Sequence, residues 1–64
     1  HGEGLHHICL QVSDIRAAMA RLRQMGFRLL SEEPSEGAGG SLVAFVHPRS
    51  ANGVLLELCQ PARR

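Results

Sequence analysis

The sequence predicts an α+β fold made of one βαβββ module, with a mixed four-stranded sheet and one helix on one face. Three observations predict it. Apolar residues alternate near the start of the chain, recur at helical spacing in the next segment, and then fill three short runs separated by turn residues. We expect residues 1–64 to form this single module, because so short a chain has room for only one core.

The first strand is expected over residues 6–12, HHICLQV, where a period of two directs side chains alternately to the two faces of a sheet. One face is more apolar than the other and should meet the helix. The apolar face carries His6, Ile8, Leu10 and Val12, while His7, Cys9 and Gln11 lie on the opposite face.

The helix is expected over residues 15–25, where apolar side chains recur every three or four positions. Ser13-Asp14 precedes it as an N-cap signal, since short polar side chains satisfy the first free N–H groups of a helix. Gly26 follows it as a residue that ends helices in the left-handed conformation. The positions expected to face the sheet are Ile15, Ala18, Met19, Leu22 and Met25.

The rest of the chain predicts three strands joined by a loop and a hairpin. The segment 31–40, SEEPSEGAGG, is typical of an exposed, mobile loop. Asn52-Gly53 is a strong hairpin signal, and Pro61 ends the last strand because proline cannot donate to a sheet. The expected strands are 27–30, 41–46 and 54–59.

The composition argues against several classes of function. Seven basic and six acidic side chains give a net charge of +1, without the basic stripe typical of nucleic-acid binding. The longest apolar run is too short to cross a membrane. Cys9 and Cys59 are too few for a disulfide framework, so we expect reduced thiols and a cytoplasmic location. The first residue is His rather than Met, which is typical of a processed chain or a fragment.

Two polar residues interrupt the apolar strands. Glu57 lies within VLLELC, and the period of two places it on the face opposite the helix, which also carries His7. A half-buried carboxylate needs a partner, because burying it unpaired costs several kcal/mol, and the chain contains no Lys. A divalent metal bound by both side chains would supply one, since imidazole nitrogen and carboxylate oxygen suit first-row metals. A surface pair or a simple hydrogen bond between the two residues is the alternative.

Several motifs occur in a characteristic order. His6-His7 opens the first strand, Glu32-Glu33-Pro34 precedes a glycine-rich loop, Phe45 is followed by His47-Pro48, and GVLLEL holds the strand glutamate. Over residues 4–60 this order resembles the C-terminal half of the methylmalonyl-CoA epimerases. That family belongs to the vicinal oxygen chelate superfamily, together with glyoxalase I.

The resemblance implies half of a glyoxalase-like fold, in which two βαβββ modules form a cupped barrel around one metal. It implies that His7 and Glu57 are metal ligands and that Glu57 also takes part in proton transfer. The nitrogen and oxygen donors suit Co, Mn, Ni or Zn. The implied activity is metal-assisted epimerisation next to the thioester carbonyl of an acyl-CoA substrate.

Family members also draw a histidine, a glutamine and a catalytic glutamate from a first module that is absent here. We therefore expect either a missing first module or a homodimer, in which two copies build a His2Glu2 site on a two-fold axis.

Two other residues are candidates for substrate contact. His47, before Pro48, either shapes the turn or contacts substrate. Gln11 shares the face of His7 and either supports the site or is simply solvated. Two further functions remain alternatives: a non-catalytic binding module of the same superfamily, and an inactive half-domain in which His7 and Glu57 are only hydrogen-bonded. No nucleic-acid or membrane partner is expected.

Overall fold

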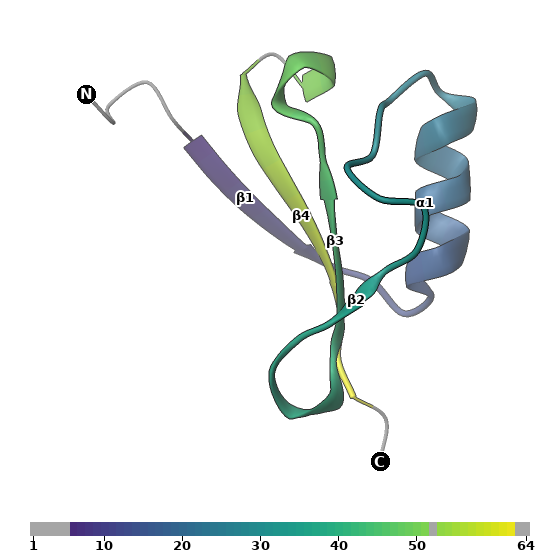
Figure 1. The fold of residues 1–64 in the computed structure, drawn as a ribbon, viewed down its shortest axis with the longest axis vertical. Coiled ribbons are helices and arrows are strands. Elements are labelled where there is room, and N and C mark those ends of the chain that lie inside the picture. The colour runs from purple at the N-terminus through teal and green to yellow at the C-terminus, as the bar shows by residue number, and fades with distance from the viewer. Residues whose placement is uncertain (1–5, 52, 63–64) are drawn as a thin grey trace.

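The elements follow one another in the order β-α-β-β-β, in a computed structural model that describes residues 6–51 and 53–62 (Figure 1). Together they form one mixed four-stranded sheet with a single helix, as predicted. None of the described helices is long and apolar enough to span a membrane. The elements are β1 (His6–Gln11), α1 (Ile15–Gln24), β2 (Ser35–Glu36), η2 (Ala38–Gly40), β3 (Leu42–Val46), η3 (Pro48–Ala51) and β4 (Val54–Gln60).

The sheet has the strand order β1-β4-β3-β2, which places the first and last strands side by side. β1 is parallel to β4, while β3 is antiparallel to both β4 and β2. The hairpin between β3 and β4 turns through η3 and Gly53, which has the positive φ of 82° that glycine tolerates best. The predicted hairpin is therefore present, although Asn52 of the turn signal lies outside the described residues.

The second strand differs from its predicted bounds. Within 27–30, only Leu29 forms an isolated bridge, with Val46, although the Leu30 N–H also donates to the Phe45 carbonyl at 2.9 Å. The strand proper is β2, inside the segment expected to be a loop, and it pairs with the first two residues of β3. The prediction of a strand over 27–30 was wrong, because the chain leaves β3 after Leu30 and returns to it only at Ser35.

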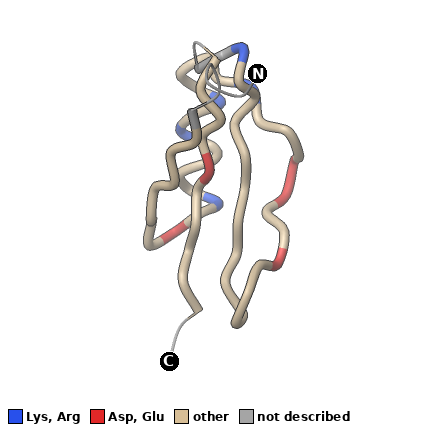
Figure 2. The backbone as a smooth tube through the Cα atoms, turned by 90° about the vertical axis from the view of Figure 1, so that its left-hand side faces the viewer, with Lys and Arg blue, Asp and Glu red and all other residues tan. Residues whose placement is uncertain are grey.

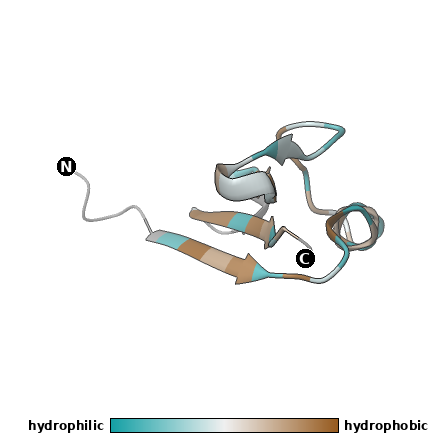
Figure 3. Ribbon diagram, turned by 90° about the horizontal axis from the view of Figure 1, so that it is seen from below, coloured by the Kyte–Doolittle hydropathy of each residue, from teal (hydrophilic) through white to brown (hydrophobic). Residues whose placement is uncertain are grey.

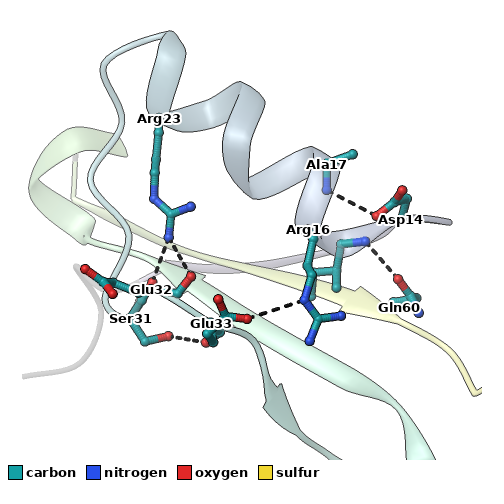
Figure 4. A network of polar contacts seen from close by, with 9 residues as sticks. Asp14, Arg16, Ala17, Arg23, Ser31, Glu32, Glu33 and Gln60 are labelled. Carbon is teal, nitrogen blue, oxygen red and sulfur yellow. Dashed lines mark hydrogen bonds and ion pairs between the residues drawn. The ribbon is translucent and has the colours of Figure 1, made fainter.

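The detour between Leu30 and Ser35 is held against the helix (Figure 4). The Arg23 guanidinium donates to the carbonyl oxygens of Ser31 and Glu32, at 3.2 and 2.9 Å. Arg16 contacts the Glu33 carboxylate at 3.4 Å, and both side chains are largely exposed. The carbonyl contacts fix the position of the backbone, whereas an exposed ion pair of this kind contributes little to stability. The segment 31–40 is thus anchored to the helix at its start and pairs with β3 as β2 near its middle.

The core lies between α1 and the two middle strands of the sheet. Ile15 and Met19 of α1 are each 1% exposed, and they pack against side chains from the helix side of β3 and β4. Those side chains are Ala44 and Leu58, and Val46 of β3 is also buried. Burial of these residues provides most of the stability available to so short a chain, because buried apolar area is the main favourable contribution to folding.

The helix covers less of the sheet than the sequence predicts. Ile8 and Leu10 lie opposite Leu56 and Leu58 in the strand register, so they are on the helix side as expected. They nevertheless remain 46% and 47% exposed, because α1 packs over β3 and β4 and leaves the outer strand uncovered (Figure 3). Met25, expected to face the sheet, follows the last helical residue and is also exposed. The side chain of His6 is not among those described.

Replacing the helix N-cap should weaken the whole domain. The Asp14 carboxylate accepts a hydrogen bond from the Ala17 N–H at 3.1 Å, in the N-cap position predicted for it. We expect Asp14→Ala to lower the free energy of unfolding by about 1 kcal/mol, the usual cost of a lost cap. Urea denaturation followed by circular dichroism measures this. Asp14→Asn keeps an acceptor oxygen and should remain close to wild type; an equal loss in both variants would contradict the capping role.

Candidate metal and substrate site

His7 and Glu57 face each other on the side of the sheet opposite the helix. The register pairs Cys9 with Glu57, and side chains two residues apart share a face, so His7 and Glu57 project in the same direction. The His7 Nε2 atom lies 2.9 Å from the Glu57 Oε1 atom. The two residues singled out by the sequence are therefore in direct contact, although they are fifty positions apart in the chain.

Burial and position in the sheet distinguish Glu57 from the other acidic residues that the structure describes. It is the only Asp, Glu, Lys or Arg in β1, β3 and β4, whereas helix α1 and the loops hold most of the remaining charges (Figure 2). Its side chain is 19% exposed, while that of His7 is 52% exposed. A carboxylate in such a position needs a positively polarised partner, and the His7 ring supplies it.

Two neighbours of the carboxylate were not identified as site residues by their sequence pattern. Phe45 of β3 pairs with Glu57 from one side and Cys9 of β1 from the other, so all three side chains share the face. An aromatic ring and a thiol thus flank the carboxylate. The register of a hairpin follows from its turn, so pairing the residues of β3 and β4 outward from the turn would have placed Phe45 beside Glu57.

The other two candidate residues occupy different positions. Gln11 lies on the same face as His7, at the end of β1, opposite Cys59 in the register. His47 follows the last residue of β3, and its Nδ1 atom accepts a hydrogen bond from the Arg49 N–H at 3.1 Å. That contact ties the His47 ring to the turn η3. Gln11 therefore lies in the same strand as His7, whereas His47 lies outside the strands.

The pair offers two donor atoms of types that bind divalent metals. Each donor lies about 2.1 Å from a bound first-row ion, so two donors of one ion can be at most about 4.2 Å apart. The separation of 2.9 Å fits this limit. Within residues 6–51 and 53–62, no group of three or more His, Cys, Asp or Glu side chains could hold a metal ion. A complete site would therefore need donors beyond His7 and Glu57.

Comparison with known proteins identifies the family. Residues 1–45, well over half of the chain, match the model of the glyoxalase/bleomycin resistance protein/dioxygenase superfamily. The chain belongs to this superfamily.

Relatives within the glyoxalase/bleomycin resistance protein/dioxygenase superfamily include several epimerases. The chain is 53% identical over 58 residues to the ethylmalonyl-CoA/methylmalonyl-CoA epimerase of Cereibacter sphaeroides, covering 89% of this chain and 43% of that protein. It is 49% identical over 57 residues to the human mitochondrial methylmalonyl-CoA epimerase, covering 89% and 32%. The chain thus spans less than half the length of the curated relatives that it matches.

Solved structures of the superfamily share the fold described above. A variant of the Streptomyces coelicolor methylmalonyl-CoA epimerase, in complex with 2-nitronate-propionyl-CoA, superimposes with a TM-score of 0.85 at 41% identity. That match covers 91% of this chain and 41% of the other. A Bacillus halodurans protein gives a TM-score of 0.84 at 41% identity, covering 92% and 43%. The likeness confirms the predicted fold class and the resemblance to half of an epimerase.

The Cys9 thiol should react slowly with alkylating reagents. Its side chain is exposed, but lost hydration against the sheet, the negative charge of Glu57 and the nearby Cys59 thiol together raise the pKa of Cys9. Because the thiolate is the reactive form, a raised pKa moves the alkylation profile to higher pH. We expect iodoacetamide to modify Cys9 in a Cys59→Ala variant with a pH midpoint above that of an unstructured cysteine peptide. Mass spectrometry across the pH range measures this, and a midpoint at or below the peptide value would contradict it.

Proposed function

We propose that this chain supplies half of the active site of an acyl-CoA epimerase, which removes and returns the proton next to a thioester carbonyl. One observation carries the proposal: the His7–Glu57 contact lies on the open face of the sheet, in a chain 53% identical to an ethylmalonyl-CoA/methylmalonyl-CoA epimerase over 58 residues. The fold alone would not suffice, since one fold hosts many chemistries.

The two donors fit a divalent metal, for which we propose Co, Mn, Ni or Zn. Imidazole nitrogen and carboxylate oxygen are suited to these ions, and the 2.9 Å separation allows both atoms to reach one ion. When bound, such an ion supplies Lewis-acid stabilisation of the negative charge that develops on the carbonyl oxygen of the substrate. The two side chains hold it only in part, so the remaining donors come from another module.

Each residue of the site then has a distinct role. With an ion bound, the Nε2 atom of His7 would bind it through a nitrogen lone pair, and the carboxylate of Glu57 would supply negative charge. Glu57 is also the proposed proton acceptor of this half, although a carboxylate oxygen engaged with a cation is a weak base. Gln11 and His47 are proposed substrate contacts, Gln11 from the same face of β1 and His47 from the turn after β3.

Epimerisation requires proton transfer on both faces of the reacting carbon. A single carboxylate on one sheet face can serve one side, so a second acid–base group must come from outside this set of residues. The relatives are more than twice as long as the part that this chain covers, which leaves room for a further module of similar size. We propose that such a module, or a second copy, completes the site.

A chimera tests the proposed function. The segment of the Cereibacter sphaeroides relative that matches this chain is replaced by residues 4–60, and the purified chimera is loaded with Co²⁺. We expect it to interconvert the two epimers of methylmalonyl-CoA and to exchange the α-proton for deuterium in D2O. A chimera that folds and takes up cobalt, yet leaves both the epimer ratio and the α-proton unchanged, would overturn the proposal.

An inactive half-domain is the second candidate, and one observation favours it. The His7–Glu57 hydrogen bond already gives each side chain a partner without a metal. Equilibrium dialysis against Co²⁺, followed by elemental analysis, separates the two: the epimerase proposal requires metal uptake that depends on both residues, whereas the inactive half requires none.

A further inference from the structure

Two thiols share the face of the sheet that carries His7 and Glu57. Cys9 lies in β1 and Cys59 lies in β4, and these two strands are parallel neighbours (Figure 1). The register pairs Cys9 with Glu57, and Cys59 follows Glu57 by two residues, so both thiols project in the same direction. Cys9 and Cys59 are therefore diagonal neighbours on one surface.

Both thiols are open to a ligand from solvent. Neither forms a disulfide; Cys9 is exposed and Cys59 is partly exposed. They are also near enough to influence each other, since the Cys59 thiol adds to the effects of lost hydration and of Glu57 that raise the pKa of Cys9. The pair thus offers two sulfur donors that are accessible and close together.

The spacing of the strands limits what can join the two sulfurs. Strands lie about 4.8 Å apart and rise about 3.3 Å per residue, so diagonal neighbours have Cα atoms about 8 Å apart. A disulfide joins Cα atoms no more than about 7 Å apart. An ion between the sulfurs makes a longer bridge, because two metal–sulfur bonds span about 4.6 Å, against about 2.05 Å for a sulfur–sulfur bond. The pair is too widely spaced for a disulfide and fits a sulfur–metal–sulfur bridge.

The number and type of donors select the ion. In the part of the chain that the structure describes, no three His, Cys, Asp or Glu side chains come together as a metal-binding group, so an ion on the thiols has two protein ligands. Zn²⁺ takes four ligands in a structural site. Cu(I) is satisfied by two thiolates in a line, and soft sulfur ligands favour it over harder ions. Two sulfurs on an open face therefore suit Cu(I) better than Zn²⁺.

We propose that Cys9 and Cys59 together bind one soft monovalent ion of the Cu(I) class, in addition to the donor pair formed by His7 and Glu57. On binding, each thiol releases its proton to solvent and forms one metal–sulfur bond. No electron is transferred, so the step needs no oxidant or reductant.

The face then carries two donor pairs of different chemistry. Cys9 and Cys59 offer sulfur, whereas His7 and Glu57 offer nitrogen and oxygen, which suit harder ions. Because Cys9 lies opposite Glu57 in the register, an ion on the thiols lies beside the carboxylate. The thiol site follows from the placement of the two cysteines and does not depend on the proposed function.

Competition for Cu(I) tests the site. The full chain, kept anaerobic with ascorbate, is titrated into the coloured Cu(I) complex of bathocuproine disulfonate, and the loss of colour gives the affinity. We expect wild type to withdraw one Cu(I) per chain. Cys9→Ser and Cys59→Ser should each weaken binding by at least about 100-fold, because a single thiol lacks the advantage of a linked pair of donors. A wild type that withdraws no Cu(I), or serine variants that bind as tightly as wild type, would overturn the proposal.

A chain with one thiol moved provides the control. The double variant Cys59→Ala, Ala20→Cys keeps two thiols but places the second at an exposed position of α1. We expect it to bind Cu(I) as weakly as the serine variants, with a circular dichroism spectrum like that of wild type. Wild-type affinity in this variant would show that any two thiols suffice, and would overturn the proposal.

Two further measurements locate the ion. Native mass spectrometry should show one Cu(I) on a single chain; an ion found only between two chains would contradict a site within one molecule. Glu57→Gln should keep the Cu(I) affinity of wild type to within about tenfold, since the carboxylate is a neighbour of the ion and not its ligand. A loss as large as that of Cys59→Ser would assign the ion to Glu57 and overturn the thiol site.

Discussion

Glu57→Gln is expected to lower the affinity of the protein for Co²⁺ by at least about 100-fold, since even the loss of an outer-shell contact at a metal site costs about 10- to 100-fold. Glutamine has nearly the same shape and can still accept the hydrogen bond that His7 offers at 2.9 Å. The substitution therefore removes the negative charge and leaves the contact largely in place. Isothermal titration with Co²⁺, on wild type and variant in parallel, measures the difference.

A matched control distinguishes the loss of a metal ligand from the loss of one negative charge. Glu36→Gln removes the same charge from β2, where the side chain is exposed and lies away from the pair. We expect its affinity for Co²⁺ to equal that of wild type. Equal affinities for wild type and both variants would mean that Glu57 holds no metal. Equal losses in both variants would mean that the ion responds only to net charge.

Met19→Ala is expected to remove most of the stability of the domain. Met19 is 1% exposed and packs against the sheet together with Ile15, in a core with few members. Truncating a buried methionine costs about 2–5 kcal/mol, through lost burial and the cavity left behind. Folded domains have only about 5–15 kcal/mol in total, and short chains lie at the lower end. Urea denaturation followed at the helical circular dichroism band should show a large shift of the midpoint to lower urea.

The same substitution at the other methionine of the chain, Met25, provides the control. Met25 is 63% exposed just beyond the helix, so Met25→Ala should alter the free energy of unfolding by no more than about 0.5 kcal/mol. Similar losses in the two variants would show that helix propensity or the unfolded state, rather than burial against the sheet, sets the stability.

The sequence was sufficient to place the two key side chains on one face. A period of two within each strand, together with the hairpin turn after β3, assigns Glu57 to the face opposite the helix. The contact with His7 could not be derived in the same way. It depends on the parallel register of β1 with β4, which is established by packing between the two ends of the chain and not by any local signal.

The second strand shows where local signals fail. Residues 27–30 are apolar enough to suggest a strand, yet only Leu29 forms a bridge there. Ser35 and Glu36 have no particular preference for extended structure, and they form β2 because β3 offers free backbone partners beside them. Exposure of Ile8 and Leu10 was unforeseen for a related reason: periodicity tells which face a residue occupies, but not how far a helix extends across that face.

Anomalous diffraction at the cobalt edge, on crystals of the protein grown with Co²⁺, tests most directly whether His7 and Glu57 share one ion. We expect a single strong peak about 2.1 Å from both the His7 Nε2 atom and a carboxylate oxygen of Glu57. A peak elsewhere on the molecule, or no peak while the imidazole and the carboxylate remain hydrogen-bonded to each other, would contradict the account.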